Sequence, residues 1–321
     1  MNVHGWTGVS GFRAAVRATE AVAALPAVPT QDWCDRAAAG LLTVKQPSIA
    51  LCMITRWTEA GTPSFIEAAG VAGCSFAEVG TTLGRHTASS TCLRLEPGHP
   101  ALARLRASAE NLANLGWSPE RLSRSTPQAA PVETLDLGAP WREGPIGQRW
   151  GEVGAVDVVL GATPLGDPDD HRILFVEFGL TSPEASATTE DAAVIDAILP
   201  ALARRALLAF GSSPSSEAQR LTPREELVLE HLLQGKSVRQ IAEELGRSPH
   251  TVHDHVKALH RKLNASTRGA LVARALGHID LGPVGPGRRA EPGGSLRGAE
   301  EVEVNGEHAS TRRFTANPPP P

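Results

Sequence analysis

The chain has 321 residues, a formal net charge of −4 and a hydrophobic share of 41%. This length accommodates two domains and a tail, and the composition is ordinary for a globular protein with a proper core. No run approaches the roughly 18 uninterrupted apolar residues of a membrane helix, and the N-terminus lacks the pattern of a signal peptide. We therefore expect a cytoplasmic protein with no membrane partner.

Charge is distributed unevenly along the chain. Residues 1–220 hold 17 Lys and Arg against 23 Asp and Glu, whereas residues 247–274 hold 6 against 1. All six tryptophans lie at or before Trp150, so the two ends of the chain differ in composition. An acidic body with one basic patch indicates a localised anionic partner.

The N-terminal part, residues 1–210, has the pattern of a mixed α and β domain. Short apolar runs at residues 48–57 and 64–73, separated by a turn, predict one hairpin. Runs at residues 155–165 and 172–180, separated by the acidic turn GDPDDH, predict a second hairpin. We therefore expect an antiparallel sheet in this part of the chain.

Helices are predicted between and after these strands. Residues 31–42 are Ala-rich, and residues 100–116 form an amphipathic pattern that ends at a glycine. Residues 188–210 form a long apolar helix that Thr188 caps and Pro200 is expected to kink. This order of elements, on which alone the likeness rests, resembles the small-molecule sensing domains of the GAF type. The alternative is an unrelated α+β dimerisation domain.

Two further segments separate on composition. Residues 211–220, which begin GSSPSSEAQ, are expected to form a flexible polar linker. Residues 281–321 are rich in Gly, Pro and charge, so they cannot bury enough apolar surface to fold, and we expect a disordered tail. The four cysteines form no C-x-x-C pair and are expected to be free, buried thiols.

Residues 221–280 carry the boundary signals of four helices. A Ser or Thr stands where each helix is expected to begin, at Thr222, Ser237, Ser248 and either Ser266 or Thr267. The first two are followed three residues later by Glu or Gln, which predicts capping boxes, and Pro249 occupies the first position of the third helix. Short turns join the helices, so the second and third fit a helix-turn-helix.

The third helix of this unit is amphipathic. Its apolar residues fall at i, i+4, i+7 and i+11 and form one stripe, Val252, Val256, Leu259 and Leu263. The opposite face carries polar and basic residues, namely His250, His253, Asp254, Lys257 and Arg261. A helix that is buried on one side and basic on the other can enter the major groove of DNA.

The unit resembles the LuxR-type, also called GerE-type, DNA-binding domain. The matching residues are Leu221, Thr222, Arg224, Glu225, Val228, Leu229, Gly235, Ser237, Ile241, Ala242, Leu245, Ser248, Thr251, Val252, His255, Val256, Lys262, Leu263 and Arg268. The resemblance implies four helices, of which the third reads DNA and the fourth contacts a second copy of the chain. Leu227, Val238 and Arg247 depart from the family pattern, which leaves the recognised DNA sequence open rather than the fold.

The resemblance also implies roles for individual residues. Base contacts fall to His253, Asp254 and Lys257, and phosphate contacts to Arg247, Thr251, His255, Arg261 and Lys262. Contacts between two copies of the chain fall to Leu271, Val272 and Leu276. The expected partners are double-stranded DNA and a second copy of the chain, with RNA polymerase and an unknown small-molecule ligand left open.

Other kinds of site were weighed against this interpretation. His250 and Asp254 share a helix face, but His253 and His255 point about 200° apart, which disfavours a metal site. The chain has no G-x-S-x-G, G-x-x-x-x-G-K-[ST] or H-E-x-x-H motif. The chain also lacks the acidic residues of a phospho-receiver domain and the Tyr/Trp/Asp pattern of acyl-homoserine-lactone domains. Its fourth helix fits the LuxR type rather than a sigma factor. We expect no enzyme, no metal and no cofactor.

Two alternatives stay open at this stage. Arg142 and Trp150 line a ligand pocket or belong to ordinary packing. For the whole chain, one interpretation is a DNA-binding transcriptional regulator that its N-terminal domain controls. The other is an enzyme or small-molecule-binding protein in which the helix-turn-helix is an accessory. The placed matches in residues 221–280 favour the regulator.

Overall fold

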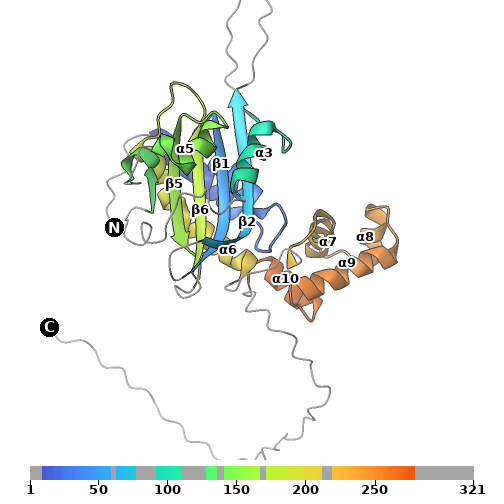
Figure 1. Ribbon diagram of the computed structural model, residues 1–321. Coiled ribbons are helices and arrows are strands. Elements are labelled where there is room, and N and C mark those ends of the chain that lie inside the picture. The colour runs from blue at the N-terminus through green and yellow to red at the C-terminus, as the bar shows by residue number, and fades with distance from the viewer. Residues whose placement is uncertain are drawn as a thin grey trace, which may run out of the picture. The chain divides into compact units, whose positions relative to one another are not determined.

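The computed structural model describes residues 9–58, 63–76, 92–109, 128–135, 141–166, 171–211 and 219–278. Within these residues the N-terminal part is a six-stranded sheet with helices on its faces, and the C-terminal part consists of helices (Figure 1). None of the described helices combines the length and the apolar character that crossing a bilayer requires.

The sheet has the order β3-β2-β1-β6-β5-β4, and each neighbouring pair is antiparallel. Its strands are β1 (Ser48–Trp57), β2 (Pro63–Phe76), β3 (Cys92–Arg94), β4 (Ala129–Pro131), β5 (Asp157–Pro164) and β6 (Arg172–Leu180). The two central strands, β1 and β6, pair along their whole length, from Ser48 opposite Leu180 to Arg56 opposite Arg172. Nearly every residue of both strands is buried, which explains their continuous apolar runs.

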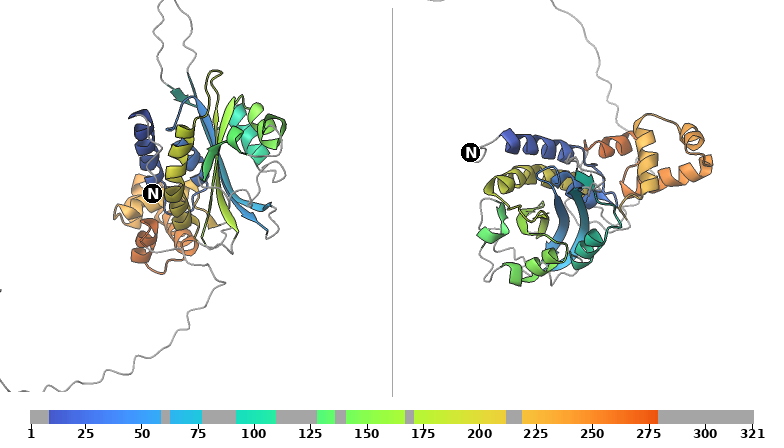
Figure 2. Two further views of the ribbon diagram at one scale, coloured as in Figure 1. Left: turned by 90° about the vertical axis from the view of Figure 1, so that its left-hand side faces the viewer. Right: turned by 90° about the horizontal axis from the view of Figure 1, so that it is seen from above.

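Helices cover both faces of the sheet (Figure 2). One face carries α1 (Val9–Ala23), α2 (Trp33–Leu41) and α6 (Thr189–Phe210). The other carries α3 (Pro100–Ala109) and α5 (Pro145–Gly151), together with the 3-10 turns Val132–Thr134 and Trp141–Glu143. The sheet is therefore the middle layer of three.

The side chains of β6 divide between these two faces. Leu174, Val176 and Phe178 belong to the core that the sheet shares with α1, α2 and α6. Ile173 and Phe175 belong to the core on the side of α3 and α5. This alternation follows the two-residue period of a strand, so one central strand supplies both cores.

A buried ion pair joins the sheet to the end of α6. Arg172 of β6 donates from Nε to Glu67 of β2 at 3.0 Å, and both side chains are 0% exposed. Its Nη1 donates to the carbonyl oxygen of Gly211 at 2.8 Å, directly after the last helical residue. The guanidinium therefore fixes the point at which the chain leaves the N-terminal domain.

The C-terminal part contains α7 (Pro223–Leu233), α8 (Val238–Glu244), α9 (Pro249–Lys262) and α10 (Arg268–Ala275). Their apolar side chains form a core of their own, which includes Leu229, Ile241, Leu259 and Leu271. The expected four-helix unit is confirmed.

The expected fold class is confirmed, an α+β domain with an antiparallel sheet followed by an all-α unit. Both expected hairpins exist, as β1 with β2 and as β5 with β6. The helix predicted at residues 31–42 begins later, at Trp33, and α6 begins after the predicted cap, Thr188, whose side chain accepts a hydrogen bond from the backbone of Asp191. The likeness to the GAF type and the kink at Pro200 stay predictions.

Some elements were not predicted, and some predictions fall outside the described residues. Sequence patterns did not predict α1, α5, β3 or β4. The first turn of α1 has no acidic residue, and the other three elements are three to seven residues long. Three predicted segments lie outside the described part: the tail at residues 281–321, the turn at residues 167–170 and all but the ends of the linker at residues 211–220. All four cysteines are free thiols, as expected, and Cys34, Cys52 and Cys74 are buried, whereas Cys92 is only half-buried.

The Arg172 pair predicts a large effect on stability. Glu67→Leu leaves the buried guanidinium without this counter-charge, so we expect a loss of about 3–5 kcal/mol in the free energy of unfolding. Urea unfolding followed by tryptophan fluorescence measures it, because every tryptophan lies in the N-terminal part. The matched control is Glu133→Leu, whose exposed partner Arg142 lies at 3.6 Å and whose loss should cost about 0–1 kcal/mol. Equal losses in the two variants would contradict the prediction.

Candidate nucleic-acid interface

Local hydrogen bonds fix where each helix of the C-terminal unit begins. The side chains of Thr222 and Ser237 accept from the backbone of Glu225 and Gln240, and both helices have complete capping boxes. The other two helices are capped by Ser248 and by Thr267, the second of the two residues considered from the sequence. Gly235 and Gly246, at φ of +85° and +60°, allow the turns after α7 and α8. The helix boundaries predicted from caps are therefore confirmed.

The apolar stripe of α9 anchors this helix to the rest of the unit. Val252, Leu259 and Leu263 are at most 1% exposed, and Val256 is half-buried. The helix packs against both α7 and α8. Its remaining face is consequently directed away from the core.

That remaining face carries the three residues expected to contact bases. His253, Asp254 and Lys257 are all exposed. Asp254 lies between two cationic or protonatable neighbours, with Lys257 Nζ at 3.6 Å and His250 Nε2 at 3.7 Å from its carboxylate. The structure thus brings these side chains together at the surface of α9, and the weak pairing of Asp254 reduces the repulsion it would exert on DNA phosphates.

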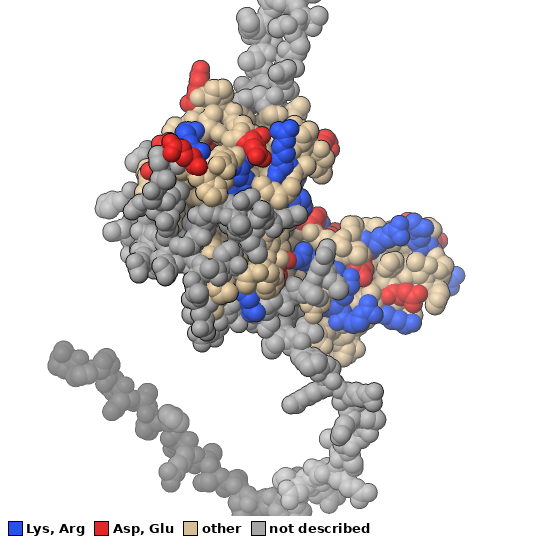
Figure 3. Space-filling view, viewed as in Figure 1, with Lys and Arg blue, Asp and Glu red and all other residues tan. Residues whose placement is uncertain are grey.

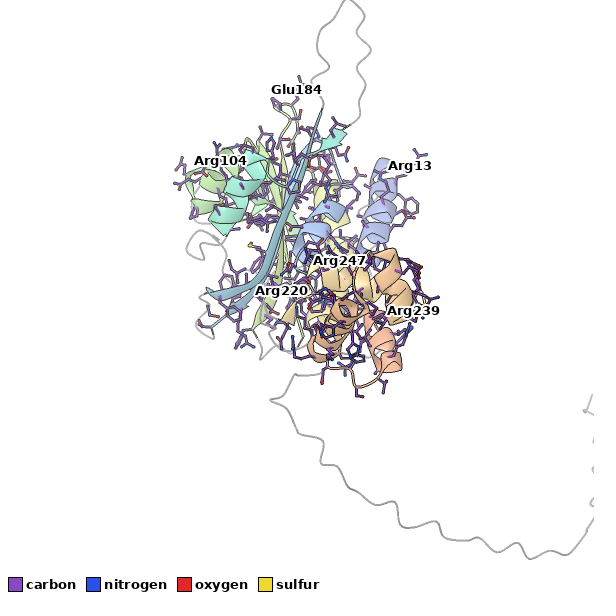
Figure 4. All side chains as sticks on the ribbon, turned by 90° about the vertical axis from the view of Figure 1, so that its right-hand side faces the viewer. Arg13, Arg104, Glu184, Arg220, Arg239 and Arg247 are labelled. Atoms are coloured by element: carbon purple, nitrogen blue, oxygen red, sulfur yellow. The ribbon has the colours of Figure 1, made fainter. Side chains whose placement is uncertain are left out.

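The residues expected to contact phosphate occupy different environments. Arg247, Thr251 and Arg261 are exposed, whereas His255 is half-buried. Figure 3 shows Lys and Arg side chains on the surface of this helical unit, with acidic side chains between them. Figure 4 labels Arg247, from the turn before α9, and Arg239, from α8, which sequence reasoning did not single out.

Lys262 requires a correction. Its Nζ donates to Glu225 Oε2 at 2.7 Å and to the carbonyl oxygen of Arg220 at 2.7 Å, and its side chain is 12% exposed. The same oxygen of Glu225 accepts from the backbone and hydroxyl of Thr222, at 2.8 and 3.0 Å. The charge of Lys262 is therefore matched by a carboxylate inside the unit, and the residue joins the end of α9 to the start of α7, which disfavours the expected contact with DNA phosphate.

These contacts perturb the ionisation of Glu225. Burial alone would raise the pKa of this carboxyl, but the hydrogen bonds from Lys262 and Thr222 outweigh it and lower the pKa below its usual value. A lowered pKa in the folded state means that the ionised carboxylate stabilises the fold, and that this contribution is lost as the pH falls through that pKa.

Leu271 also requires a correction. Its side chain is 0% exposed and belongs to the core of the four helices, so it is not free to contact a second copy of the chain. Leu276 is 54% exposed and Val272 is half-buried, so the contact with a second copy stays a prediction for these two residues. The resemblance assigned all three to the contact between copies, but it could not show which of them the core of the four helices buries.

Two residues that sequence reasoning left without a structural role make hydrogen bonds inside the unit. Arg268 donates from Nη2 to the carbonyl oxygens of Leu232 and Lys236, at 3.0 and 2.9 Å, where α7 ends. His260 Nδ1 lies 2.7 Å from the carbonyl oxygen of Ala265. No local periodicity reports such contacts between segments, although Arg268 stood among the positions that match the family.

The alternative sites find no support in the geometry. Among the described residues, no group of three or more His, Cys, Asp and Glu is placed to hold a metal ion. Trp150 is 0% exposed, and its Nε1 donates to the buried carboxylate of Glu177 at 2.6 Å, while Arg142 is exposed and donates to the carbonyl oxygen of Val156. These contacts favour ordinary packing over a ligand pocket for this pair.

The Lys262 pairing predicts a stability effect that depends on pH. Lys262→Met removes a charge-assisted hydrogen bond, so we expect the helical unit to lose about 1.5–3 kcal/mol near neutral pH. In the wild type the same stability should fall as the pH drops below the usual range of a Glu side chain, because the pKa of Glu225 is lowered in the fold. Hydrogen exchange at amides of α7 and α9 measures both effects. A variant as stable as the wild type at neutral pH would restore Lys262 as a candidate for phosphate contact.

Comparison with known proteins agrees with this geometry. Residues 219–275 match the family model described as GerE, bacterial regulatory proteins of the luxR family. The transcriptional regulatory protein UhpA of Escherichia coli (strain K12) is 50% identical over 54 residues, which are 17% of this chain and only 28% of the relative's length.

Solved structures give weaker matches. Escherichia coli SdiA matches with a TM-score of 0.32 at 17% identity, over 75% of this chain and 88% of the other. A phage VqmA–DPO complex matches with a TM-score of 0.19 at 29% identity, over 37% and 47%. The family match and the four capped helices agree on one stretch, and residues 219–275 are a LuxR-type helix-turn-helix domain.

Proposed function

We propose that the chain is a DNA-binding transcriptional regulator, in which α9 reads bases in the major groove and the N-terminal domain controls this binding. The observation that carries the proposal is the exposed face of α9, which presents His253, Asp254 and Lys257 while the opposite side of the helix is buried. The E. coli relative, a transcriptional regulatory protein, supports the proposal for the shared domain.

The chemistry of the exposed face fits base edges. Lys257 can donate to the acceptors of guanine, and Asp254 can accept from the amino group of cytosine. His253 immediately precedes Asp254 in the sequence and can donate or accept. Because the side chains of Lys257 and Asp254 already contact each other at 3.6 Å, they restrain one another before DNA is bound.

Phosphate contacts fall to residues around this face. Arg247 and Thr251 flank the start of α9, and Arg261 lies near its end, all of them exposed. His255 is half-buried and would contact phosphate only along the edge of the helix. Such contacts set the orientation of the helix in the groove and supply affinity without sequence preference.

The partners and the control of the protein are part of the proposal. Double-stranded DNA is the first partner, and a second copy would contact α10 through Val272 and Leu276. RNA polymerase and a small-molecule ligand of the N-terminal domain are further partners that the proposed activity calls for. DNA as the partner places this activity in the cytoplasm.

The base-reading role of Lys257 is tested by substitution. Lys257→Ala should cost about 1–3 kcal/mol of binding free energy and relax the preference at one base position. Affinities are measured on the duplex that the wild-type chain enriches from a random library and on its single-base variants. The control is Arg142→Ala, which removes one positive charge from the N-terminal domain instead. Unchanged affinity and preference in Lys257→Ala would remove this residue from the reading face.

The phosphate-contacting role of Arg261 gives a different signature. Arg261→Ala should weaken all duplexes alike and reduce the slope of log affinity against log salt by about one unit, because one fewer counterion is released. A salt titration on the enriched duplex and on an unrelated duplex checks this. A change in base preference with an unchanged salt slope would show that Arg261 reads bases.

A further inference from the structure

The segment between α1 and α2 contacts the LuxR-type domain. We define the connector as residues 24–32, which lie between these two helices. The backbone nitrogen of Leu221 donates to the carbonyl oxygen of Pro29 at 2.7 Å, and that of Gln31 donates to the carbonyl oxygen of Leu221 at 3.1 Å. These bonds form a parallel bridge between Thr30 and Leu221, one residue before the cap of α7.

A side chain of the connector also enters the core of the helical domain. Val28 is 3% exposed and packs within the same cluster as Leu221, Val228 and Leu271. At the other end of the domain, a Cβ added to Gly277 would lie 3.2 Å from the Cβ of Ala27, so this backbone approaches the connector closely. The helical domain therefore buries apolar surface against a segment almost 200 residues earlier in the chain.

An ion pair reinforces the contact beside the bridge. Arg36 of α2 lies 2.7 Å from the carboxylate of Glu226 of α7, whose side chain is 14% exposed. The same guanidinium donates to Asp32 at 2.8 Å. Charge complementarity and apolar burial thus occur at the same place.

The connector is itself fixed to the N-terminal domain. Trp33, at the start of α2, is 0% exposed and donates from Nε1 to the carbonyl oxygen of Pro26 at 3.0 Å. Its ring packs edge-on against Phe210 of α6, with centroids 5.4 Å apart. A displacement of α2 or of the end of α6 would therefore move the connector with it.

On its other side, the contact continues to the recognition helix. Leu221, which pairs with the connector, stands directly after Arg220 and four residues before Glu225. Both of these accept hydrogen bonds from Lys262 at the end of α9. The exposed face of α9 stays uncovered while the connector is bound, so the contact does not act by masking that face.

We propose that the connector is a docking strap through which the N-terminal domain grips the LuxR-type domain in solution and sets the orientation of α9. The strap makes the recognition helix move with α2 and α6, so that the chain after α6 is not the sole connection between the domains. The consequence for DNA, a fixed separation of two recognition helices in a dimer, rests on the proposed function, whereas the docking itself does not.

Hydrogen exchange in the full-length protein tests the docking without DNA. Arg36→Glu places a carboxylate beside those of Glu226 and Asp32, so the amides of Gln31 and Leu221 should exchange about fivefold faster. Glu226→Arg combined with Arg36→Glu restores opposite charges and should restore protection. The control, Arg142→Glu, alters an exposed pair inside the N-terminal domain and should leave both amides unchanged.

A second variant tests the docking through its apolar contact, in case the Arg36 ion pair contributes little to it. Val28→Asp places a carboxylate among apolar side chains and should accelerate exchange at the same two amides more than about tenfold, while amides of β1 and β6 keep their protection. Unchanged exchange at Gln31 and Leu221 in both Arg36→Glu and Val28→Asp would overturn the docking strap.

DNA binding then tests the consequence for orientation. The duplex that the wild type enriches from a random library is lengthened by about five base pairs, half a helical turn, between its two half-sites. The wild type should lose at least tenfold in affinity, and Val28→Asp should lose clearly less, because its recognition helices are no longer held. An equal loss in both proteins would overturn the control of orientation. A wild type that bound no duplex would refute the proposed function and leave the exchange result to decide the docking.

Discussion

The geometry of the DNA-binding unit depends on the hydrogen bonds that the carboxylate of Glu225 accepts. Its Oε2 accepts from the backbone and hydroxyl of Thr222, which begins α7, and from Nζ of Lys262, which ends α9. One oxygen thus fixes the start of the first helix of the unit and the end of the recognition helix. The apolar core alone would leave α9 free to slide or rotate by small amounts, because burial is not directional. The directional contacts at its end remove that freedom.

This use of charge changes what the basic patch can do. Residues 247–274 hold 6 basic residues against 1 acidic residue, which in the sequence looks like a surface built for phosphate. In the structure, Lys262 is matched by Glu225, Arg268 joins helices through backbone carbonyls, and Lys257 lies beside Asp254. The field available to a distant phosphate is therefore weaker than the count suggests. Recognition in the proposed function rests more on the close chemistry of α9 than on long-range attraction.

What the sequence predicted correctly was encoded within a few residues. Thr222 and Ser248 mark the starts of their helices because their side chains accept hydrogen bonds from the backbone three residues later. The apolar run of β1 reflects burial on both faces of a sheet. What it missed depends on contacts between distant segments. Lys262 pairs with a carboxylate 37 positions away, and Leu271 is buried in the core that the four helices share, which its position on α10 alone does not determine. Because these contacts join distant segments, Lys262 and Leu271 were expected to bind partners but have structural contacts inside the unit.

The connector extends the same reasoning from the unit to the chain. Val28 stands in the Pro-containing stretch LPAVPT, which has no helical or strand period, so nothing local marks it as part of another domain's core. Its contact with Leu221 lies beside the Glu225 and Lys262 pair, at the end of α9 opposite to its capped start at Ser248. A helix of 14 residues spans about 21 Å and behaves as a rigid rod over that length. A small rotation of α9 at the Lys262 end therefore also turns the residues that face DNA. The N-terminal domain, which holds the connector, can control the orientation of those residues without contacting DNA.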